Sequence, residues 1–353
     1  MKLWLRDETK ANERRTPLTP QDTQKILDAG IEVVVEESND RIFKTEEYKR
    51  LGCKIVPAHS WKDAPKDYVI LGLKEIEDDH LFYHHHIYFA HVFKGQSHAD
   101  KILSQYKKGG GTLYDLEYLT NEEGRRVCAF GHWAGFAGAA FALDRFYHKK
   151  ANSSEFPALD SYPSIETLFE RIQAHKDEPK VQPRAIIIGA LGRCGNGAKE
   201  LFNKFQVETT LWDYPETKAG GPFKEIIDHH IFVNAALITK PIEPFLTKEL
   251  ANDNQSQLEI IADVSCDPNS DLNPIPLYNQ HTSWKKPFLK TELSNELEIM
   301  SVDNLPSTLP RESSIDFSSQ LTQYLIEFLT QKNELPTEFA NARDVFEKKL
   351  SEV

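Results

Sequence analysis

Two residues that can exchange protons stand directly after short apolar runs in the first third of the chain. Lys74 follows Leu71-Gly-Leu73, and His91 follows Tyr88-Phe-Ala90. An imidazole exchanges protons near neutral pH, and a lysine in a cleft beside other cations has its pKa lowered towards that range. Because ligands of an open α/β sheet bind outside the carboxyl ends of its strands, we expect both side chains to point into one crevice. A solvated lysine and a buried structural histidine are the alternatives that position alone leaves open.

Several cations near these two residues could bind acidic groups of a ligand. Arg15 lies in a basic loop before a capped helix, where its guanidinium could form a bidentate pair with a substrate carboxylate. Lys94 and the pair Arg125-Arg126 are similar candidates, and exposed charged loops are the alternative. The net charge of the chain is −12, so a few placed cations would have to overcome a repulsive field around any anionic ligand.

A glycine-rich turn in the second half has the pattern of a dinucleotide site. A β-branched run at 186–188 leads into Gly189, Gly192, Gly195 and Gly197, followed by a helical segment at 198–205 and a strand at 208–212. In this order a pyrophosphate binds backbone N–H groups at a helix N-terminus. Asp213 follows roughly twenty residues on, where a carboxylate binds ribose hydroxyls and repels a 2′-phosphate, so NAD is favoured over NADP. The spacing is GxxGxxG rather than GxGxxG, and a tight turn without a ligand is the alternative.

A run of histidines, at positions 84 to 86 with His80 before it, raises the question of a zinc site. Three consecutive histidines on a strand point to alternate faces, and no Cys, Asp or Glu completes a tetrahedral set at the usual spacing. We therefore predict no metal site and expect the run to lie on the surface.

The elements that must position these residues alternate between strands and helices. We expect strands at 2–6, 31–36, 69–73, 87–90, 112–116, 184–188, 208–212, 231–235, 259–264 and 298–302. Helices are expected at 19–30, 45–51, 99–106, 133–144, 164–174, 198–205, 318–330 and 336–350. Strands alternating with helices predict parallel α/β sheets. The small residues of the helix at 133–144 predict close packing against neighbouring backbone.

At 353 residues, two domains are the default for this chain. The predicted fold is α/β, with two Rossmann-like domains of parallel sheets flanked by helices and an active-site cleft between them. We expect residues 1–132 plus 318–353 to form a substrate and catalytic domain, and residues 133–317 to form the NAD-binding domain.

The composition favours a cytoplasmic protein that acts on small molecules. No apolar run is long enough to span a bilayer and no apolar leader precedes the first strand, so the mature chain is expected to start near Met1. The acidic net charge argues against nucleic acid as the main partner. The four cysteines lack CxxC spacing and are expected to be free thiols: Cys53, Cys128, Cys194 and Cys266.

Motifs spread over most of the chain resemble the NAD-dependent, lysine-forming saccharopine dehydrogenases of the fungal α-aminoadipate pathway. The matching stretches are 5–10, 72–75, 89–91, 111–117, 124–126, 134–139, 189–195, 220–223, 273–276 and 309–312. The Leu-Thr-Pro and Lys-Glu motifs are shared with alanine dehydrogenases and the transhydrogenase domain. The stretches from 124 to 139 and from 189 to 195 are specific to the saccharopine enzymes.

The resemblance implies a role for individual residues. Lys74 and His91 correspond to the acid–base pair. The substrate-contacting positions are Arg15, Lys74, Arg126, Phe130, Ser265, Cys266 and Asp267. The NAD-contacting positions are Arg125, Gly192, Arg193, Asp213, Thr217, Val264, Val302, Asp303, Asn304 and Leu305.

The chain departs from the family pattern at three positions. Ala235 replaces the cysteine that pairs with the Cys194 position in some relatives, so that disulfide cannot form. Leu237 replaces a tyrosine near the adenine, and Ala219 replaces an arginine before the Gly-Gly-Pro-Phe motif. None of the three touches the proposed acid–base pair.

The reaction implied by the resemblance is the reversible conversion of saccharopine, NAD and water to lysine, 2-oxoglutarate and NADH, by a monomer. Hydride leaves the glutamate α-carbon once the secondary amine is deprotonated, and the imine then needs an activated water and a proton on the departing nitrogen. We expect Lys74 to serve the amine and His91 to serve the water. An alanine-dehydrogenase-like amino-acid dehydrogenase and an inactive NAD-binding regulator are the alternatives.

Overall fold

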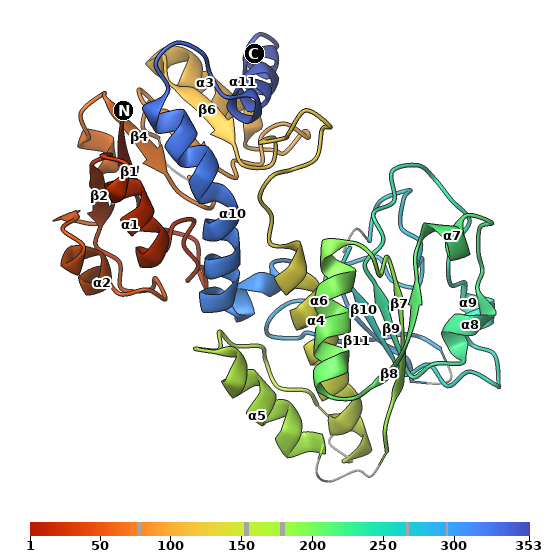
Figure 1. The fold of residues 1–353 in the computed structure, drawn as a ribbon. Coiled ribbons are helices and arrows are strands. Elements are labelled where there is room, and N and C mark those ends of the chain that lie inside the picture. The colour runs from red at the N-terminus through yellow and green to blue at the C-terminus, as the bar shows by residue number, and fades with distance from the viewer. Residues whose placement is uncertain (77–78, 152–154, 177–180, 266–267, 294–295) are drawn as a thin grey trace. The chain divides into compact units, whose positions relative to one another are not determined.

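The computed structural model describes residues 1–353 except 77–78, 152–154, 177–180, 266–267 and 294–295. The chain divides into two compact units, as Figure 1 allows the reader to follow. Unit 1 comprises Met1–Ala129 and Pro310–Val353, and unit 2 comprises Phe130–Leu309. Each unit contains a six-stranded sheet with helices packed on it, which confirms the predicted α/β class.

The sheet of unit 1 has the order β3-β2-β1-β4-β5-β6, and every pair in it is parallel. Its strands are β1 (Lys2–Leu5), β2 (Val33–Glu36), β3 (Lys54–Val56), β4 (Tyr68–Leu71), β5 (His85–Tyr88) and β6 (Thr112–Asp115). The helices are α1 (Pro20–Asp28), α2 (Thr45–Arg50), α3 (Ala99–Gly109), α10 (Pro310–Thr330), α11 (Thr337–Leu350) and the 3₁₀ helix η1 (Ser60–Asp63). The strand order reverses between β1 and β4, and a reversal of this kind opens a ligand crevice at the carboxyl ends of doubly wound sheets.

Local signals explain where the first helix of unit 1 begins and ends. The Thr19 side chain accepts a hydrogen bond from the backbone of Asp22, and Pro20 occupies the first turn, where its missing N–H is not needed. After the helix, Gly30 has a φ of 79°, which favours glycine. Helix α10 contacts the start of α1, because Ser318 Oγ accepts a hydrogen bond of 3.0 Å from the Thr19 backbone.

The sheet of unit 2 has the order β11-β12-β10-β9-β7-β8 and is parallel except for β11. Its strands are β7 (Arg184–Ile188), β8 (Glu208–Trp212), β9 (Ile231–Asn234), β10 (Ile260–Asp263), β11 (Leu289–Lys290) and β12 (Glu298–Met300). The helices are α4 (Gly131–Lys150), α5 (Ile165–Lys176), α6 (Arg193–Lys204), α7 (Tyr214–Thr217), α8 (Lys224–Ile227), α9 (Lys248–Ala251) and the 3₁₀ helix η2 (Leu305–Thr308).

Helices α4 and α6 approach each other through glycines. A Cβ on Gly135 would overlap the carbonyl of Cys194, and one on Gly197 would overlap the carbonyl of His132. The close backbone packing predicted for the small-residue helix is therefore confirmed. The expected start of the following helix at 198 is wrong, because α6 begins at Arg193 and includes Gly195 and Gly197. Packing on α4 compensates for the low helix propensity of glycine.

Two histidines of the run, His84 and His86, lie inside unit 1, so the expectation of a surface position is wrong for them, whereas His85 between them is exposed. His84 is 3% exposed and His86 is fully buried, because both lie on the same covered face of the sheet at β5, an interior strand. The His86 ring lies 5.3 Å from the Trp61 ring and 5.7 Å from the Tyr106 ring, centroid to centroid. Within the described part of the chain, no three His, Cys, Asp or Glu side chains are placed to hold a metal ion.

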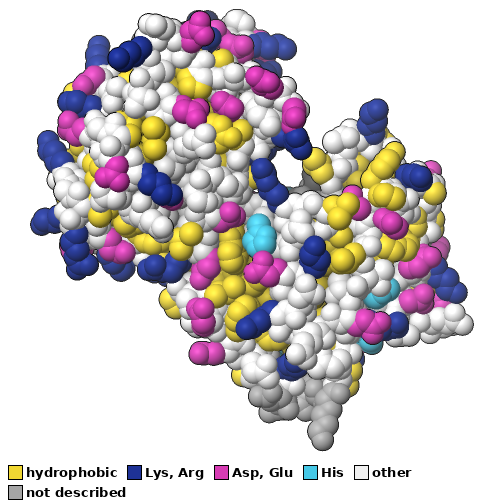
Figure 2. Space-filling model, in the orientation of Figure 1, with side chains coloured by type: hydrophobic (Ala, Val, Ile, Leu, Met, Phe, Trp, Pro, Cys, Tyr) yellow, Lys and Arg dark blue, Asp and Glu magenta, His cyan; other side chains and the backbone are white. Residues whose placement is uncertain are grey.

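Two further observations concern the distribution of charge on the surface and the apolar character of the helices. Figure 2 shows acidic and basic side chains interspersed on the displayed face rather than gathered into one patch of a single sign. Among the described residues, no helix combines the length and the apolar character needed to cross a bilayer.

Candidate active site

Charged residues follow the carboxyl ends of four strands in unit 1. Glu13 and Arg15 lie in the loop after β1, and Lys74 follows β4. His91 follows β5, and Asp115 ends β6. Carboxyl ends of parallel strands share one edge of the sheet, so the topology brings these side chains to the place where such folds bind ligands.

Lys74 is half-buried among charges of both signs. Burial lowers the pKa of its amine, and the Arg15 guanidinium lowers that pKa further. The carboxylates of Glu13 and Glu75 act in the opposite direction but do not cancel the effect. A lysine in this environment releases its proton more readily than an exposed one, which suits acid–base exchange.

His91 is held by a carboxylate that the sequence analysis did not single out. Its Nδ1 lies 2.5 Å from Glu75 Oε1, and Glu75 Oε2 accepts a hydrogen bond of 3.1 Å from Lys10 Nζ. Burial opposes ionisation of Glu75, but the contacts with His91 and Lys10 outweigh it and hold the pKa of the carboxyl well below its ordinary value. His91 also has a φ of 51°, an uncommon left-handed backbone conformation of the kind that collects at functional sites.

Arg15 does not present the open fork expected from the sequence. Its Nε donates to Glu13 Oε1 at 2.8 Å and its Nη2 donates to Glu13 Oε2 at 2.6 Å. Both side chains are buried, with exposures of 3% and 1%. Burial opposes ionisation of Glu13, but Arg15 more than compensates and lowers the pKa of the carboxyl. One edge of the Arg15 guanidinium is therefore bound to Glu13 within the protein.

A third carboxylate organises the cations near the end of β6. Glu117 Oε1 accepts hydrogen bonds from Lys94 Nζ at 2.8 Å and from Arg126 Nη2 at 2.9 Å. Asp115, beside it, is buried, and this burial raises the pKa of Asp115 to about 6. Arg125 is exposed and pairs with Glu123.

In unit 2, a hollow of about 280 Å³ lies at the glycine-rich turn. It is lined by Ile188, Gly189, Gly192, Asp213, Tyr214, Thr217, Ala235, Ala236, Leu237, Ile238 and Phe245. Gly189 has a φ of 91°, and a Cβ there would meet the Ala235 carbonyl carbon at 2.6 Å, so the turn requires glycine. The chain then enters α6 at Gly192, the N-cap, and the first N–H groups of a helix have no carbonyl of their own helix to bind.

Asp213 stands at the end of β8 and closes this turn. Its Oδ2 accepts a hydrogen bond of 2.8 Å from the Leu191 backbone, and its Oδ1 accepts one of 2.9 Å from the Tyr214 backbone. Each carboxylate oxygen can accept a further hydrogen bond, as ribose hydroxyls require. The hollow, the helix N-terminus and the carboxylate fit the adenosine and pyrophosphate parts of NAD. Leu237, which departs from the family pattern, is 89% exposed on the rim.

The remaining predicted cofactor positions lie in unit 2 after neighbouring strands. Val264 follows β10, and Val302 and Asp303 follow β12. Asn304 precedes η2 with a φ of 66°. A Cβ on Gly138 of α4 would meet Val264 Cγ2 at 2.6 Å and Leu305 Cδ1 at 3.6 Å, so Val264 and Leu305 pack at the same place on α4.

The other expected residues are placed as follows. Phe130 is the N-cap of α4, and Arg193 is the exposed first residue of α6. Thr217 Oγ1 donates to the Asp213 carbonyl at 3.0 Å, and Ser265 Oγ donates to the Ala236 carbonyl at 2.7 Å. Cys266 and Asp267 lie outside the described residues. Cys194 is a free thiol.

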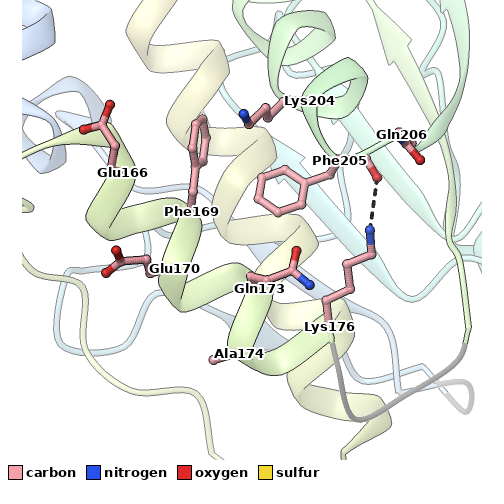
Figure 3. Close-up of a pocket in the computed structure, with 9 residues that line it drawn as sticks. All are labelled: Glu166, Phe169, Glu170, Gln173, Ala174, Lys176, Lys204, Phe205 and Gln206. Atoms are coloured by element: carbon pink, nitrogen blue, oxygen red, sulfur yellow. Dashed lines mark hydrogen bonds between the residues drawn. The ribbon is translucent and has the colours of Figure 1, made fainter.

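A hollow of about 730 Å³ lies elsewhere in unit 2, between α5 and the end of α6 (Figure 3). The rings of Phe169 and Phe205 lie 5.6 Å apart there, and Lys176 Nζ donates to the Phe205 carbonyl. Its lining contains none of the predicted site residues, so size alone does not identify the candidate site.

The site residues missed by sequence reasoning are mainly acidic. Glu75 directly follows Lys74, and Glu13 stands two positions before Arg15. The signal that could have revealed them is this proximity, because a buried cation needs a carboxylate partner.

Three comparisons identify similar proteins. A family model described as "Alanine dehydrogenase/PNT, N-terminal domain" matches residues 4–137. The saccharopine dehydrogenase (NAD(+), L-lysine-forming) of Candida albicans is 40% identical over 372 residues, covering 99% of this chain and 97% of its own. The protein of the same name from Neurospora crassa is 42% identical over 360 residues, covering 99% of this chain and 96% of its own.

Among solved structures, an L-alanine dehydrogenase matches with a TM-score of 0.66 and 15% identity, covering 99% of this chain and 94% of that one. This likeness shows the shared fold. The high identity of the two fungal relatives over nearly the full chain shows the family. The chain belongs to the NAD-dependent, L-lysine-forming saccharopine dehydrogenases.

Proposed function

We propose that the protein catalyses the reversible oxidative deamination of L-saccharopine by NAD and water, giving L-lysine, 2-oxoglutarate and NADH. The observation that carries the proposal is the half-buried Lys74, whose pKa is lowered, beside a His91 held by Glu75 at the neighbouring strand end. Family membership supplies the substrate, and the site supplies two proton carriers of different kinds.

Lys74 is assigned to the secondary amine of saccharopine. Burial favours the neutral form of its amine, and this form is the one that can accept a proton from the substrate. His91 is assigned to the water that attacks the imine. Its Nδ1 is bound by Glu75, so Nε2 is the nitrogen for proton exchange with that water.

NAD supplies the hydride acceptor. We assign its pyrophosphate to the N-terminus of α6 at Gly192 and Arg193, and its adenosine ribose to Asp213 and Thr217. Val264 and the segment 302–305 are assigned to the rest of the cofactor, with Arg125 beside it.

The substrate carboxylates are assigned to Arg15 and Arg126. Each arginine is oriented by a buried or half-buried glutamate, Glu13 or Glu117. Phe130 and the segment 265–267 complete the proposed substrate contacts. A monomeric state and a cytoplasmic location belong to the same proposal, and sedimentation and cell fractionation test them.

The oxidation of NADH by the purified protein tests the reaction. Turnover with lysine plus 2-oxoglutarate, and none with pyruvate plus ammonia, is the expected result. Turnover only with pyruvate plus ammonia would assign the protein to the alanine dehydrogenase type of reaction. NADH binding without turnover on either pair would indicate a regulator.

Two variants test the assigned roles. Lys74→Met and His91→Gln should each lower kcat by about 10²–10⁴-fold, the usual contribution of a general acid or base. NADH affinity should stay at the parent value in both. Loss of NADH binding in either variant would mean that the residue serves the fold rather than the chemistry.

A further inference from the structure

Arg6 and Glu8 form a buried ion pair directly after β1, next to the point where the strand order of unit 1 reverses. Arg6 Nη1 lies 3.3 Å from Glu8 Oε2, and the two side chains are 2% and 7% exposed. Neither residue belongs to the proposed acid–base pair or to the proposed substrate contacts.

This pair binds the backbone of Lys74, more than sixty residues later in the chain. Glu8 Oε1 accepts a hydrogen bond of 2.7 Å from the Leu73 backbone, and Glu8 Oε2 accepts one of 2.9 Å from the Lys74 backbone. Arg6 Nη2 donates to the Lys74 carbonyl. The N–H and the C=O of Lys74 are therefore both bound by one buried pair.

The ladder of the sheet ends just before Lys74. The last strand-like contacts on this segment are from the Gly72 backbone to the Ile87 carbonyl, at 3.0 Å, and from the Phe89 backbone to the Leu73 carbonyl, at 3.1 Å. At Lys74 the backbone N–H and C=O are bound by the side chains of Glu8 and Arg6.

The position of the Arg6 side chain is itself restricted. A Cβ on Gly72 would overlap its guanidinium, so the arginine fits only because glycine stands there. On another side, the Arg6 guanidinium lies 5.6 Å from the centre of the Tyr88 ring. A guanidinium restricted in this way holds the Lys74 carbonyl in one place.

A buried ion pair is a weak source of stability, because desolvation offsets most of its attraction. What such a pair supplies well is a defined geometry for the groups that it binds. We propose that Arg6 and Glu8 are positioning residues that fix the backbone of Lys74 and so direct its amine towards the substrate. This inference rests on the proposed catalytic role of Lys74.

The variant Glu8→Gln tests the inference, because the amide keeps one acceptor and turns an N–H₂ group towards a backbone N–H. A displacement of about 1 Å at a catalytic group can cost about 10²-fold in rate, so we expect kcat to fall about 10–100-fold. NADH affinity should stay at the parent value. Arg6→Lys keeps the positive charge, loses the contact with the Lys74 carbonyl and should lower kcat in the same way.

Glu298→Gln is the matched control. Glu298 forms an equally buried pair with Arg145 in unit 2, with hydrogen bonds of 2.6 and 2.7 Å and exposures of 3% and 4%. It stands at the amino end of β12, away from the carboxyl edge where cofactors bind. This control should lose stability and keep the parent kcat.

The double variant Glu8→Gln/Lys74→Met separates positioning from general damage. If Glu8 acts through Lys74, adding Glu8→Gln to Lys74→Met changes kcat by less than about twofold. A parent-like kcat in Glu8→Gln would overturn the inference. It would also be overturned if Glu8→Gln lowered kcat by the same factor in the Lys74→Met background as in the parent. A parent-like kcat in Lys74→Met alone would instead overturn the proposed function. If Glu8→Gln does not fold, Arg6→Lys replaces it in the test. Its effect on kcat is then compared between the parent and the Lys74→Met background.

Discussion

Replacing Glu13 by glutamine should lower the pKa of Lys74. Burial and Arg15 already lower that pKa, and Glu13 is the first of two carboxylates that oppose them. The substitution removes an opposite charge and also leaves the Arg15 charge without its partner, so both consequences act in the same direction. A nearby opposite charge favours the charged form of a lysine, so its loss lowers the pKa of Lys74 further.

The direction of the kinetic effect follows from the proposed role of Lys74. The neutral amine is the form that accepts the proton of saccharopine, and a lower pKa makes this form available at lower pH. The acid limb of the pH profile of kcat for saccharopine oxidation should therefore move to lower pH. Steady-state rates of NADH formation across acidic, neutral and alkaline pH measure this shift.

The substitution also has a cost in stability that can be judged in advance. Glu13 and Arg15 are 1% and 3% exposed, and removing one partner of a buried pair costs about 3–5 kcal/mol. Domains are stable by about 5–15 kcal/mol, so the variant should remain folded near room temperature. Urea unfolding of Glu13→Gln and of the control Glu298→Gln measures this cost.

The control separates the charge effect from the loss of a buried pair. Glu298→Gln breaks a pair of similar burial and leaves the carboxylates around Lys74 in place, so its acid limb should not move. A limb that stays in place, or moves up, in folded Glu13→Gln protein would refute the electrostatic account of Lys74.

Two further predictions concern other parts of the chain. Burial holds the pKa of His86 well below its ordinary value of 6.5, so the unfolded chain takes up this proton first and stability falls by about 1.4 kcal/mol per pH unit as pH drops below about 6.5. His86→Phe should reduce the slope by this amount in urea unfolding at acidic pH, and an unchanged slope would contradict the assignment. Asp213→Asn loses the charge and keeps an acceptor for only one of the two backbone N–H groups that bind Asp213, so the preference for NAD over NADP in kcat/KM should fall about tenfold or more, or about 1.4 kcal/mol. An unchanged preference would remove Asp213 from the ribose site.

The elements and the order of the motifs could be predicted from local sequence. The apolar run before Gly189, the glycine turn and the acid at Asp213 are signals carried by neighbouring residues, and β7, α6 and β8 form there. The positions of Lys74 and His91 after strands are predicted for the same reason. Hydrophobic periodicity and the glycines and prolines that end an element are patterns within a few neighbouring residues.

The pairing of side chains was decided by the tertiary structure. The bond between Glu75 and His91 depends on β4 and β5 being neighbours, and the burial of His86 depends on the rings of Trp61 and Tyr106. The sequence predicts a ligand contact for Arg15, and only the structure shows that its Nε and Nη2 bind Glu13. The type of an element follows from residues close in sequence. The partner of a charged group follows from strand order and packing between distant segments, which a single sequence does not state.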